Sequence, residues 1–452
     1  MNLTVVILAA GKGTRMKSVL PKVLHALAGK PLLGHVFDVA EQLSANKIIT
    51  VIGHGSEHVQ KKYSAKNIIW VEQTEQLGTG HAVQQALPHI SADEKVLVLY
   101  GDVPLISVST LQRLLAIDSP YNILTLEMEN PHGYGRIVRD EVKEIVAIIE
   151  EKDAEPEQKK IKEINTGVIC INGDLLHKWL PKLQNNNSQK EFYLTDLVNF
   201  AWKERVPMGS THPDLPHEVD GVNDRIQLAR LERQYQLHIA HEFMKAGISF
   251  IDPARFDLRG EFSFGMDCVL DANVIIEGSV KIGDRVHVGA NCILIDCEIG
   301  NDVAIKPNSI IEGSTIAAEC VIGPFARIRP GSELAERAHV GNFVEVKKSI
   351  IGEGSKANHL TYIGDAEIGK NVNVGAGTIT CNYDGVNKHK TVIGDGAFIG
   401  SNSSLIAPVT IGAGATIGAG SAISKDADEN ALTLTRAKQM TISSWKRPEK
   451  KK

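Results

Sequence analysis

Residues 393–423 read IGDGAFIGSNSSLIAPVTIGAGATIGAGSAI, and an aliphatic residue returns at every sixth position. These positions are Ile393, Ile399, Leu405, Ile411, Ile417 and Ile423. A six-residue period fits neither an α-helix, which repeats every 3.6 residues, nor a half-buried strand, which repeats every two. It fits a coil that turns a corner at each step and points one aliphatic side chain inward. Three steps close a triangular coil of about 18 residues, and stacked coils bury a continuous aliphatic column.

The same step occurs earlier in the chain, in two further runs. Their members are Ile299, Ile305 and Ile311, followed by Ile322, Ile328, Leu334, Val340 and Val346. An aliphatic residue followed directly by glycine occurs thirteen times between Ile282 and Gly418, and the small residue leaves room for a tight turn. We therefore expect an all-β solenoid of hexapeptide repeats beyond about residue 250.

The hexapeptide pattern breaks between Gly377 and Lys390, where the polar segment TITCNYDG intrudes. A polar insertion in a regular coil must leave the prism as a loop, and such loops often build the binding face of repeat proteins.

The first 220 or so residues alternate short apolar runs with amphipathic segments. The runs 5–8, 48–52 and 96–99 have the character of buried strands, and the segment 32–43 has apolar residues at helical spacing. Strands separated by helices predict βαβ units, in which a mostly parallel, Rossmann-like sheet is covered on both faces.

A helix is expected between these two regions. Asn223 is a plausible N-cap, an apolar stripe follows, and Gly247 stands where a helix-ending residue belongs. The stripe consists of Leu228, Leu231, Tyr235, Ile239 and Phe243. The predicted organisation is therefore an α/β domain over 1–222, a linker helix over 223–247, a β-helix domain over 248–436 and a basic, solvated tail over 437–452.

Composition excludes several classes of protein. The 452 residues are 43% hydrophobic and 23% charged, which excludes wholesale disorder, collagen and a membrane bundle. The net charge of -5 argues against a nucleic-acid-coating protein. The six cysteines form no CxxC pair, the chain begins without a basic leader, and no run is long enough to cross a bilayer. We expect reduced thiols in a cytoplasmic protein without nucleic-acid or membrane partners.

The segment LAAGKGTRM (8–16) directly follows the first predicted strand. Its glycines allow backbone N–H groups to approach an anion, and Lys12 and Arg15 add positive charge. Met16 stands at the third glycine position of the dinucleotide fingerprint, and no GK[ST] closes a P-loop. Taken alone, the glycines fit a purely structural tight turn equally well.

Two further residues point to phosphate chemistry. Lys22 supplies a second cation near the mouth of the same loop. Asp102 ends the third buried strand, and a carboxylate at the C-terminal end of a strand suits Mg²⁺. The alternative is that Asp102 caps the helix expected after Pro104.

Cations and a histidine stand inside the hexapeptide register. Arg327, Arg329, Lys347 and Lys348 are the cations, of which Arg327 and Lys348 are interpreted as outward, solvated charges. His359 interrupts a repeat among polar neighbours, and imidazole is a natural general base. The alternative for His359 is a surface or packing role.

Several motifs together resemble known families. The segments LAAGKGTRM, LPKVLH (20–25), QTEQLGTGH (73–81), YGD (100–102) and GYGRI (133–137) resemble the sugar-phosphate nucleotidylyltransferases. The hexapeptide half resembles the left-handed parallel β-helix acyltransferases. Over nearly the whole chain, this order of motifs resembles the bacterial bifunctional N-acetylglucosamine-1-phosphate uridylyltransferases and glucosamine-1-phosphate N-acetyltransferases.

The resemblance implies two reactions. Acetyl-CoA would acetylate glucosamine 1-phosphate in the C-terminal domain. The phosphate of N-acetylglucosamine 1-phosphate would then attack the α-phosphorus of UTP in the N-terminal domain, giving pyrophosphate and UDP-N-acetylglucosamine for peptidoglycan and lipopolysaccharide precursors. It also implies left-handed coils and a homotrimer in which prisms pack side by side and acetyl sites form between subunits.

The resemblance implies a residue set for the uridylyl site. Nucleotide and phosphate contacts would come from Leu8, Ala9, Ala10, Gly11, Lys22, Tyr100 and Gly101, and uracil contacts from Gln73, Gly78 and Thr79. Asp102 and Asn223 would bind Mg²⁺, and Gly135, Glu150 and Asn165 would hold the sugar. Asn223 thus carries two interpretations, helix cap and metal ligand, which are compatible.

A second set is implied for the acetyl site, with His359 as the base that deprotonates the amine. Sugar-phosphate contacts would come from Arg329, Lys347, Tyr362 and Asn373, and acetyl-CoA contacts from Ala376, Asn382, Tyr383, Ser401, Ala419 and Arg436. No Ser-His-Asp signature indicates an acyl-enzyme, and Cys381 is interpreted as a bystander.

Two other functions stay open on the sequence. One is a thymidylyl- or adenylyltransferase with a regulatory β-helix, which would lack His359 and the Asn382-Tyr383 pair. The other is a binding module for partner proteins, which predicts a degraded nucleotide loop.

Overall fold

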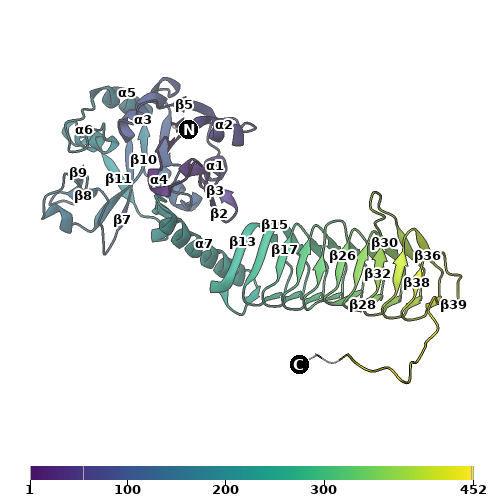
Figure 1. The fold of residues 1–452 in the computed structure, drawn as a ribbon. Helices are drawn as coiled ribbons and strands as arrows, with labels where there is room; N and C mark the ends of the chain where they lie inside the picture. The colour runs from purple at the N-terminus through teal and green to yellow at the C-terminus, as the bar shows by residue number, and fades with distance from the viewer. Residues whose placement is uncertain (1, 54, 449, 451–452) are drawn as a thin grey trace. The chain divides into compact units, whose positions relative to one another are not determined.

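The computed structural model describes residues 2–53, 55–448 and 450. The chain divides into two compact units, Met1–Tyr235 and Gln236–Lys452, and the division falls inside the predicted linker helix. Each unit has hydrophobic cores of its own. Figure 1 shows an α/β layer structure in the first unit and stacked strands in the second.

The first unit is built on a sheet with the strand order β11-β7-β10-β6-β1-β4-β5. The strands are β1 (Leu3–Ala9), β4 (Lys47–Ile52), β5 (Ile69–Glu72), β6 (Lys95–Tyr100), β7 (Tyr121–Glu127), β10 (Glu163–Asn172) and β11 (Met208–Thr211). Strands β5, β4, β1 and β6 are parallel, whereas β10 runs antiparallel to both β6 and β7. A hairpin of β8 (Arg136–Arg139) and β9 (Ile145–Ile149) pairs with β10, where Arg136 lies opposite Ile164. The predicted mostly parallel sheet is confirmed.

Helices cover both faces of this sheet. In β1, Val6 and Leu8 belong to one core, whereas Val5 and Ile7 belong to the other. The first core also contains residues of α3 (Thr79–Ala86), α5 (Gly173–Trp179) and α6 (Leu197–Lys203); the second contains residues of α1 (Leu32–Gln42), α2 (Ser56–Lys62) and α4 (Val108–Ala116). Burial on both sides explains why the central strands are apolar without alternation.

The long helix α7 (Arg225–Lys245) begins two residues later than its predicted cap. Asp224 caps it, since its Oδ1 accepts the N–H groups of Ile226 at 2.9 Å and Gln227 at 2.8 Å. The prediction of Asn223 as N-cap was therefore wrong, and Asp224 adds a negative charge where the helix dipole favours one. Gly247 follows the helix with a φ of 108°, as the sequence predicts.

The second unit is a prism of stacked parallel coils, the left-handed parallel β-helix fold of hexapeptide repeats. An 11-stranded sheet forms what we term its first face, and a 17-stranded sheet wraps around the other two. First-face strands are β12 (Ser249–Phe250), β14 (Val269–Leu270), β16 (His287–Val288), β19 (Ala304–Ile305), β22 (Val321–Ile322), β25 (His339–Asn342), β28 (Lys356–His359), β31 (Asn373–Val374), β34 (Phe398–Ile399), β37 (Thr416–Ile417) and β39 (Leu432–Thr433).

The 17-stranded sheet begins with β13 (Phe256–Ser263) and β15 (Val274–Ile282) and then divides into two ladders. The second face consists of β17 (Ile293–Ile295), β20 (Ile310–Glu312), β23 (Arg327–Ile328), β26 (Glu345–Lys347), β29 (Tyr362–Gly364), β32 (Ile379–Cys381), β35 (Ser404–Ile406) and β38 (Ala422–Ile423). The third face consists of β18 (Glu298–Ile299), β21 (Thr315–Ile316), β24 (Glu333–Leu334), β27 (Ile350–Ile351), β30 (Ala366–Ile368), β33 (Thr391–Ile393) and β36 (Val409–Ile411).

Every predicted six-step aliphatic position is buried in one continuous core, which confirms the column. Most coils have 17 or 18 residues, as the pairings of Ile293 with Ile310 and of Val321 with His339 show. The shorter coils arise where a step has five residues, as from Ile311 to Ile316. These short steps explain why the sequence shows separate six-residue runs instead of one.

The inserted segment leaves the prism later than the sequence predicts. Residues 379–381 stay in the second face as β32, and the excursion begins only at Asn382 and ends before Thr391. This coil is longer, and Asn373 pairs with Phe398 across it. The polar residues at 378 and 380 face the interior, where Thr378 and Thr380 hydroxyls bond backbone carbonyls. Figure 1 shows the loop projecting from the prism beside β30.

The six cysteines are free, and five of them are buried. Burial raises the pKa of the Cys297 thiol to about 12, so that thiol is unreactive at neutral pH. No helix in the described chain is long and apolar enough to cross a membrane. Residues 437–448 contain no helix or strand.

The neighbours Ile350 and Ile351 test the buried column. Ile351 is 1% exposed, whereas Ile350 points outward and is 42% exposed. We expect Ile351→Ala to lower the free energy of unfolding by about 2–5 kcal/mol, because it leaves a cavity in the column. Ile350→Ala should change it by less than about 0.5 kcal/mol. Guanidinium chloride unfolding of both variants is the measurement, and equal losses would contradict an inward column.

Candidate active sites

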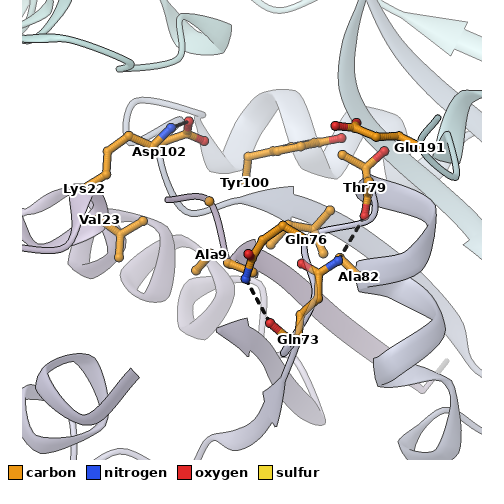
Figure 2. Close-up of a pocket in the computed structure, with 14 residues that line it drawn as sticks. Ala9, Lys22, Val23, Gln73, Gln76, Thr79, Ala82, Tyr100, Asp102 and Glu191 are labelled. Atoms are coloured by element: carbon orange, nitrogen blue, oxygen red, sulfur yellow. Dashed lines mark hydrogen bonds and ion pairs between the residues drawn. The ribbon is translucent and has the colours of Figure 1, made fainter. Parts of the chain in front are cut away.

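A cavity of about 230 Å³ opens at the C-terminal ends of β1 and β6 (Figure 2). Ten residues predicted from the sequence line it: Leu8, Ala9, Ala10, Gly11, Lys22, Gln73, Gly78, Thr79, Tyr100 and Asp102. Four more lining residues were not predicted: Val23, Gln76, Ala82 and Glu191. Glu191 belongs to a loop whose polar composition gives no signal of a site.

The order of strands brings these segments together. Strands β1 and β6 are adjacent and parallel, and Leu8 pairs with Tyr100. The N–H of Gly101 donates to the Leu8 carbonyl at 2.9 Å, which extends the pairing beyond β6. Because parallel strands end at the same edge, the loops after β1 and β6 both face the cavity.

The glycine-rich loop packs directly against Lys22. Gly13 has a φ of 61°, and a Cβ there would lie 2.7 Å from the Lys22 Cβ. A side chain at residue 13 would therefore strain the backbone and displace Lys22. Lys22 lies at the mouth of the loop, as predicted, whereas Lys12 is exposed and does not line the cavity.

The two predicted metal ligands converge on one cationic group. Lys22 forms an ion pair with Asp102 through Nζ, and the same Nζ donates to Asn223 Oδ1 at 3.3 Å. Arg15 donates to that oxygen at 2.8 Å. One carboxylate and one amide oxygen beside a glycine-rich loop fit Mg²⁺, which takes few protein ligands. The described residues contain no cluster of three or more His, Cys, Asp or Glu that could hold a metal.

Gln73 is fixed before any ligand arrives. Its side chain is 3% exposed, and its Nε2 donates to the Gly78 carbonyl at 3.2 Å and contacts His81 Nδ1 at 3.0 Å. Gln76 donates to the Gln73 carbonyl at 3.1 Å. Figure 2 shows both glutamines beneath Thr79 on one side of the cavity, opposite Lys22 and Asp102.

The predicted sugar residues lie beside Tyr100. Asn165 lines a second, smaller hollow with Tyr100 and Thr195, and the Asn165 N–H donates to the Gly135 carbonyl at 2.9 Å. Glu150 accepts from the Thr195 hydroxyl at 3.1 Å, and burial raises the pKa of Glu150. Thr195 was not predicted, because the residues around it in the sequence form no recognisable binding motif.

A half-buried ion pair lies next to two of these residues in the sequence. Arg136, which is 2% exposed, follows Gly135 and donates to Glu151 at 2.7 Å; Glu151 in turn follows Glu150. The pair therefore fixes the end of the β8–β9 hairpin that carries Gly135 and Glu150.

In the second unit, His359 ends β28 and is exposed. Its Nδ1 lies 2.8 Å from Oδ1 of Asn342, which occupies the same position one coil earlier. An amide oxygen only accepts, so Nδ1 is the donor in this contact, and in the neutral imidazole Nε2 is then the acceptor. Asn342 was missed by sequence reasoning, although the 17-residue offset from His359 could have found it.

The predicted acetyl-site residues fall on two faces of the prism. His359 and Asn373 belong to first-face strands β28 and β31. Lys347 and Tyr362 belong to second-face strands β26 and β29, and Arg329 directly follows β23. The corner between these faces carries Phe325, Phe343 and Leu360, all exposed and all with positive φ.

Three of the predicted acetyl-CoA residues, Ala376, Ser401 and Ala419, follow the same corner through successive coils. Asn402 donates its N–H to the Ala376 carbonyl at 2.8 Å, and Gly420 donates to the Ser401 carbonyl at 2.8 Å. Ala376, Ser401 and Ala419 therefore stand in one row. The Arg436 guanidinium lies next to this row, 3.7 Å from where a Cβ of Gly418 would be.

The inserted loop brings one more cation to the second face. The neighbouring ammonium of Lys347 lowers the pKa of Lys388, so two cationic groups meet beside Tyr362. Lys388 was not predicted. Asn382 is 7% exposed and donates to Asp365 at 2.5 Å, whereas Tyr383 is 60% exposed. The Asn382 side chain thus anchors the loop, and Tyr383 is the member of the pair that is open to solvent.

The two cations interpreted as solvated, Arg327 and Lys348, are exposed, while Arg329 and Lys347 are half-buried. Arg329 donates to Glu345 at 2.7 Å, and this hydrogen bond raises the pKa of Arg329.

Comparisons with known proteins match both units. Residues 5–160 match the MobA-like NTP transferase domain, residues 259–351 the GMPPB C-terminal domain, and residues 390–425 the six-repeat bacterial transferase hexapeptide. The chain is 57% identical over 454 residues to the bifunctional protein GlmU of Acinetobacter baylyi, which covers 100% of both chains. It is 56% identical to that of Acinetobacter baumannii, again with 100% of both chains covered. The chain belongs to the GlmU family.

Membership of the GlmU family makes the chain a bifunctional enzyme of UDP-N-acetylglucosamine synthesis, with uridylyltransferase and acetyltransferase activities on small-molecule substrates. The predicted family and both predicted activities are confirmed. The full-length match favours this assignment over a regulatory β-helix or a protein-binding module. The individual roles of the site residues stay predictions.

One solved structure is similar to the chain only in part. It is described as a putative glucose-1-phosphate thymidylyltransferase from Bacillus anthracis, at 17% identity and a TM-score of 0.41 over 51% of this chain and 94% of that one.

The contact between Asn342 and His359 predicts a pH effect in the acetyl-transfer reaction. Asn342→Asp should move the acid limb of the pH–rate profile to higher pH by about one unit, because a carboxylate favours the protonated imidazole. The measurement is the pH dependence of CoA release, and an unmoved acid limb with normal folding would show that the Asn342 contact does not act on the base.

Proposed function

We propose that the cavity of the first unit is the uridylyl-transfer site and that it acts by positioning and charge neutralisation. The convergence of ten predicted residues on one cavity carries this proposal. Residues 8–11 would hold the nucleotide through backbone N–H groups, and Lys22 would contact its phosphates. Gln73, Gly78 and Thr79 would recognise uracil, since the fixed Gln73 amide needs no reorganisation on binding.

In this proposal the sugar substrate lies beside Tyr100, held by Gly135, Glu150 and Asn165. A phosphate oxygen of N-acetylglucosamine 1-phosphate attacks the α-phosphorus of UTP. The new P–O bond forms as the bond to the β-phosphate oxygen breaks, and pyrophosphate leaves with the electron pair. Such a transfer needs alignment and electrostatic stabilisation, and it needs no covalent protein intermediate.

We propose Mg²⁺ as the divalent metal, held by Asp102 and Asn223. Bound there, it would neutralise charge on the transferring phosphates. Lys22 now contacts both oxygens and would turn toward phosphate. Arg15 also contacts the Asn223 oxygen and would have to release it to the metal.

At the acetyl site, His359 Nε2 would accept a proton from the amine of glucosamine 1-phosphate. The amine nitrogen then forms a bond to the acetyl carbon as the thioester bond breaks, and CoA leaves as the thiolate. Arg329, Lys347 and Tyr362 would hold the sugar phosphate, and Asn373 the sugar. Lys388 adds a second ammonium for the phosphate dianion, because it already lies beside Lys347.

The acetyl-CoA contacts would follow the row of Ala376, Ser401 and Ala419. Arg436 lies beside that row, where its charge suits a phosphate group of CoA. Tyr383, which is exposed on the loop, would meet the pantetheine arm. The Asn382 side chain bonds Asp365, so its contribution would come from anchoring the loop or from its backbone.

We further propose that the enzyme is a homotrimer whose acetyl sites form between subunits. His359 and Asn373 point outward from the first face, whereas Lys347 and Tyr362 point outward from the second. Two faces of one triangular prism diverge, so one small substrate reaches both sets only when the first face of one copy meets the second face of another. Closed rings are the usual outcome of such head-to-tail contacts. The cytoplasm is the proposed location, since six free thiols suit a reducing compartment.

Two substitutions separate the activities. His359→Ala should abolish acetyl transfer and leave uridylyl transfer, and Asp102→Ala should do the reverse, because the two residues lie in different units. CoA release and pyrophosphate release are assayed on the same purified proteins. Loss of both activities from one substitution in a folded protein would refute the assignment of separate sites.

Mixed oligomers test the intersubunit acetyl site. His359→Ala and Lys347→Ala should each be inactive in acetyl transfer, yet co-expressed subunits should regain activity at roughly a quarter of the sites, as random mixing in a ring gives. Sites that combine an intact first face with an intact second face explain the recovery. Acetyl transfer of differently tagged, co-purified oligomers is measured, with uridylyl transfer as the internal standard. No recovery would place all these residues of a site in one chain.

A further inference from the structure

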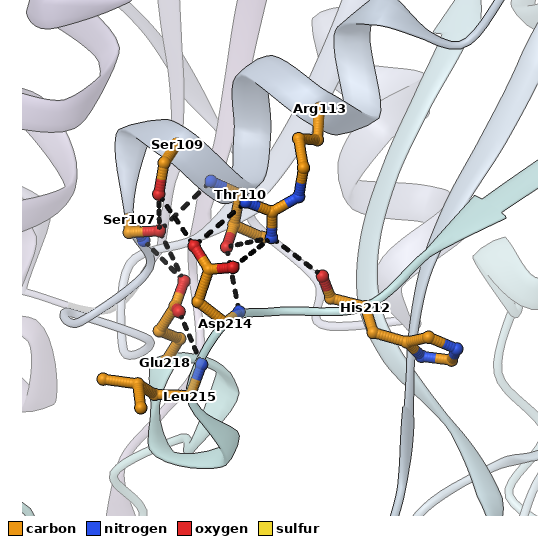
Figure 3. A network of polar contacts seen from close by, with 8 residues as sticks. All are labelled: Ser107, Ser109, Thr110, Arg113, His212, Asp214, Leu215 and Glu218. Atoms are coloured by element: carbon orange, nitrogen blue, oxygen red, sulfur yellow. Dashed lines mark hydrogen bonds and ion pairs between the residues drawn. The ribbon is translucent and has the colours of Figure 1, made fainter.

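A buried carboxylate outside the cavity ties together the two segments that carry the proposed metal ligands. Glu218 is 4% exposed and lies in a 3-10 turn, Pro216–Val219, that follows β11. Its Oε2 accepts the N–H of Ser107 at 3.1 Å and the Ser107 hydroxyl at 2.6 Å, and its Oε1 accepts the N–H of Leu215 at 2.9 Å. Figure 3 shows the Glu218 side chain directly below Ser107, reaching from the turn Pro216–Val219 toward the start of α4.

These contacts are unusual because all three donors are neutral. Burying a carboxylate is costly unless hydrogen bonds compensate for lost water, and here three donors converge on one side chain. The arrangement fixes where the chain at 215–218 stands relative to the chain at 107.

Both joined segments lead to the proposed metal site. Asp102 lies five residues before Ser107, and Asn223 lies five residues after Glu218. Beyond the Glu218 contact, the Val222 N–H donates to the Asp102 carbonyl at 2.9 Å. A Cβ on Gly221 would lie 4.0 Å from Asp102 Oδ2. The segment 218–223 is thus fixed at one end by Glu218 and at the other by Asp102 itself.

We infer that Glu218 is a positioning residue for the divalent cation of the uridylyl site. It sets the spacing between the Asp102 carboxylate and the Asn223 amide oxygen without touching the cavity. This inference rests on the proposed roles of Asp102 and Asn223 as metal ligands. Mutation of a residue that positions a metal ligand without touching the metal typically weakens metal binding about 10–100-fold.

The same two segments offer a matched control. Asp214 accepts from Ser109 at 3.0 Å and from Arg113 at 2.9 Å, so it also joins α4 to the 212–218 segment (Figure 3). Its side chain is 53% exposed, and Arg113 keeps a contact with the His212 carbonyl at 3.1 Å without it. An exposed ion pair of this kind contributes little.

The variant Glu218→Gln keeps the size of the side chain but turns an amide N–H₂ toward a donor. We expect it to weaken Mn²⁺ binding to the full-length protein with UTP about tenfold, measured by electron paramagnetic resonance of free Mn²⁺ in the absence of the sugar substrate. The Mg²⁺ activation constant for pyrophosphate release should rise by a similar factor, and high Mg²⁺ should restore the rate. Acetyl transfer should be unchanged, and Asp214→Asn should stay within about twofold throughout.

A second, milder variant tests the same contact if the first one does not fold. If Glu218→Gln does not fold, Ser107→Gly removes the hydroxyl contact with Glu218 and leaves a residue that is still accepted at a helix N-cap. It should weaken Mn²⁺ binding in the same direction.

Asp102→Asn separates this inference from the assignment of the metal ligands. Weaker Mn²⁺ binding in Asp102→Asn together with unchanged binding in folded Glu218→Gln would overturn the role of Glu218 alone. Unchanged binding in both would overturn the metal assignment and, with it, this inference.

Discussion

One aliphatic side chain must enter the axis of the prism at every corner step, and the second unit depends on this requirement. The column from Ile282 to Ile423 supplies the burial that no single short strand could provide. Because the inward positions are fixed, the outward positions are fixed as well, and residues one coil apart become neighbours. For this reason Asn342 contacts His359, although the two residues are 17 positions apart in the sequence.

The same geometry divides the acetyl site. Outward side chains of one coil point in three directions, and His359 lies on the first face whereas Lys347 lies on the second. In the first unit, by contrast, parallel strands bring Leu8 and Asp102 to one edge of a sheet. A single chain can therefore supply all residues of that cavity. The contrast explains why one activity is proposed to need neighbouring copies and the other is not.

Much of this architecture could be predicted, because periodicity and strand-loop order are local properties of sequence. The six-residue steps and the residues 8–11 with Lys22 are examples. The sequence failed to predict a contact where the residue that makes it is adjacent to the predicted one or lies far away in the chain. Asp224 took the helix cap from Asn223, and Glu218 meets Ser107 across 111 residues that no pattern connects. The sequence predicts too early a start for the loop, because Thr378 and Thr380 are polar yet remain in the coil with their hydroxyls bonded to backbone carbonyls.

The most direct test is a crystal structure of the full-length protein with glucosamine 1-phosphate and CoA. The account predicts a closed ring of three chains, with the sugar phosphate between Lys347 on the second face of one chain and His359 on the first face of the next. A sugar phosphate held by both residues of the same chain would contradict the division of the acetyl site between two faces.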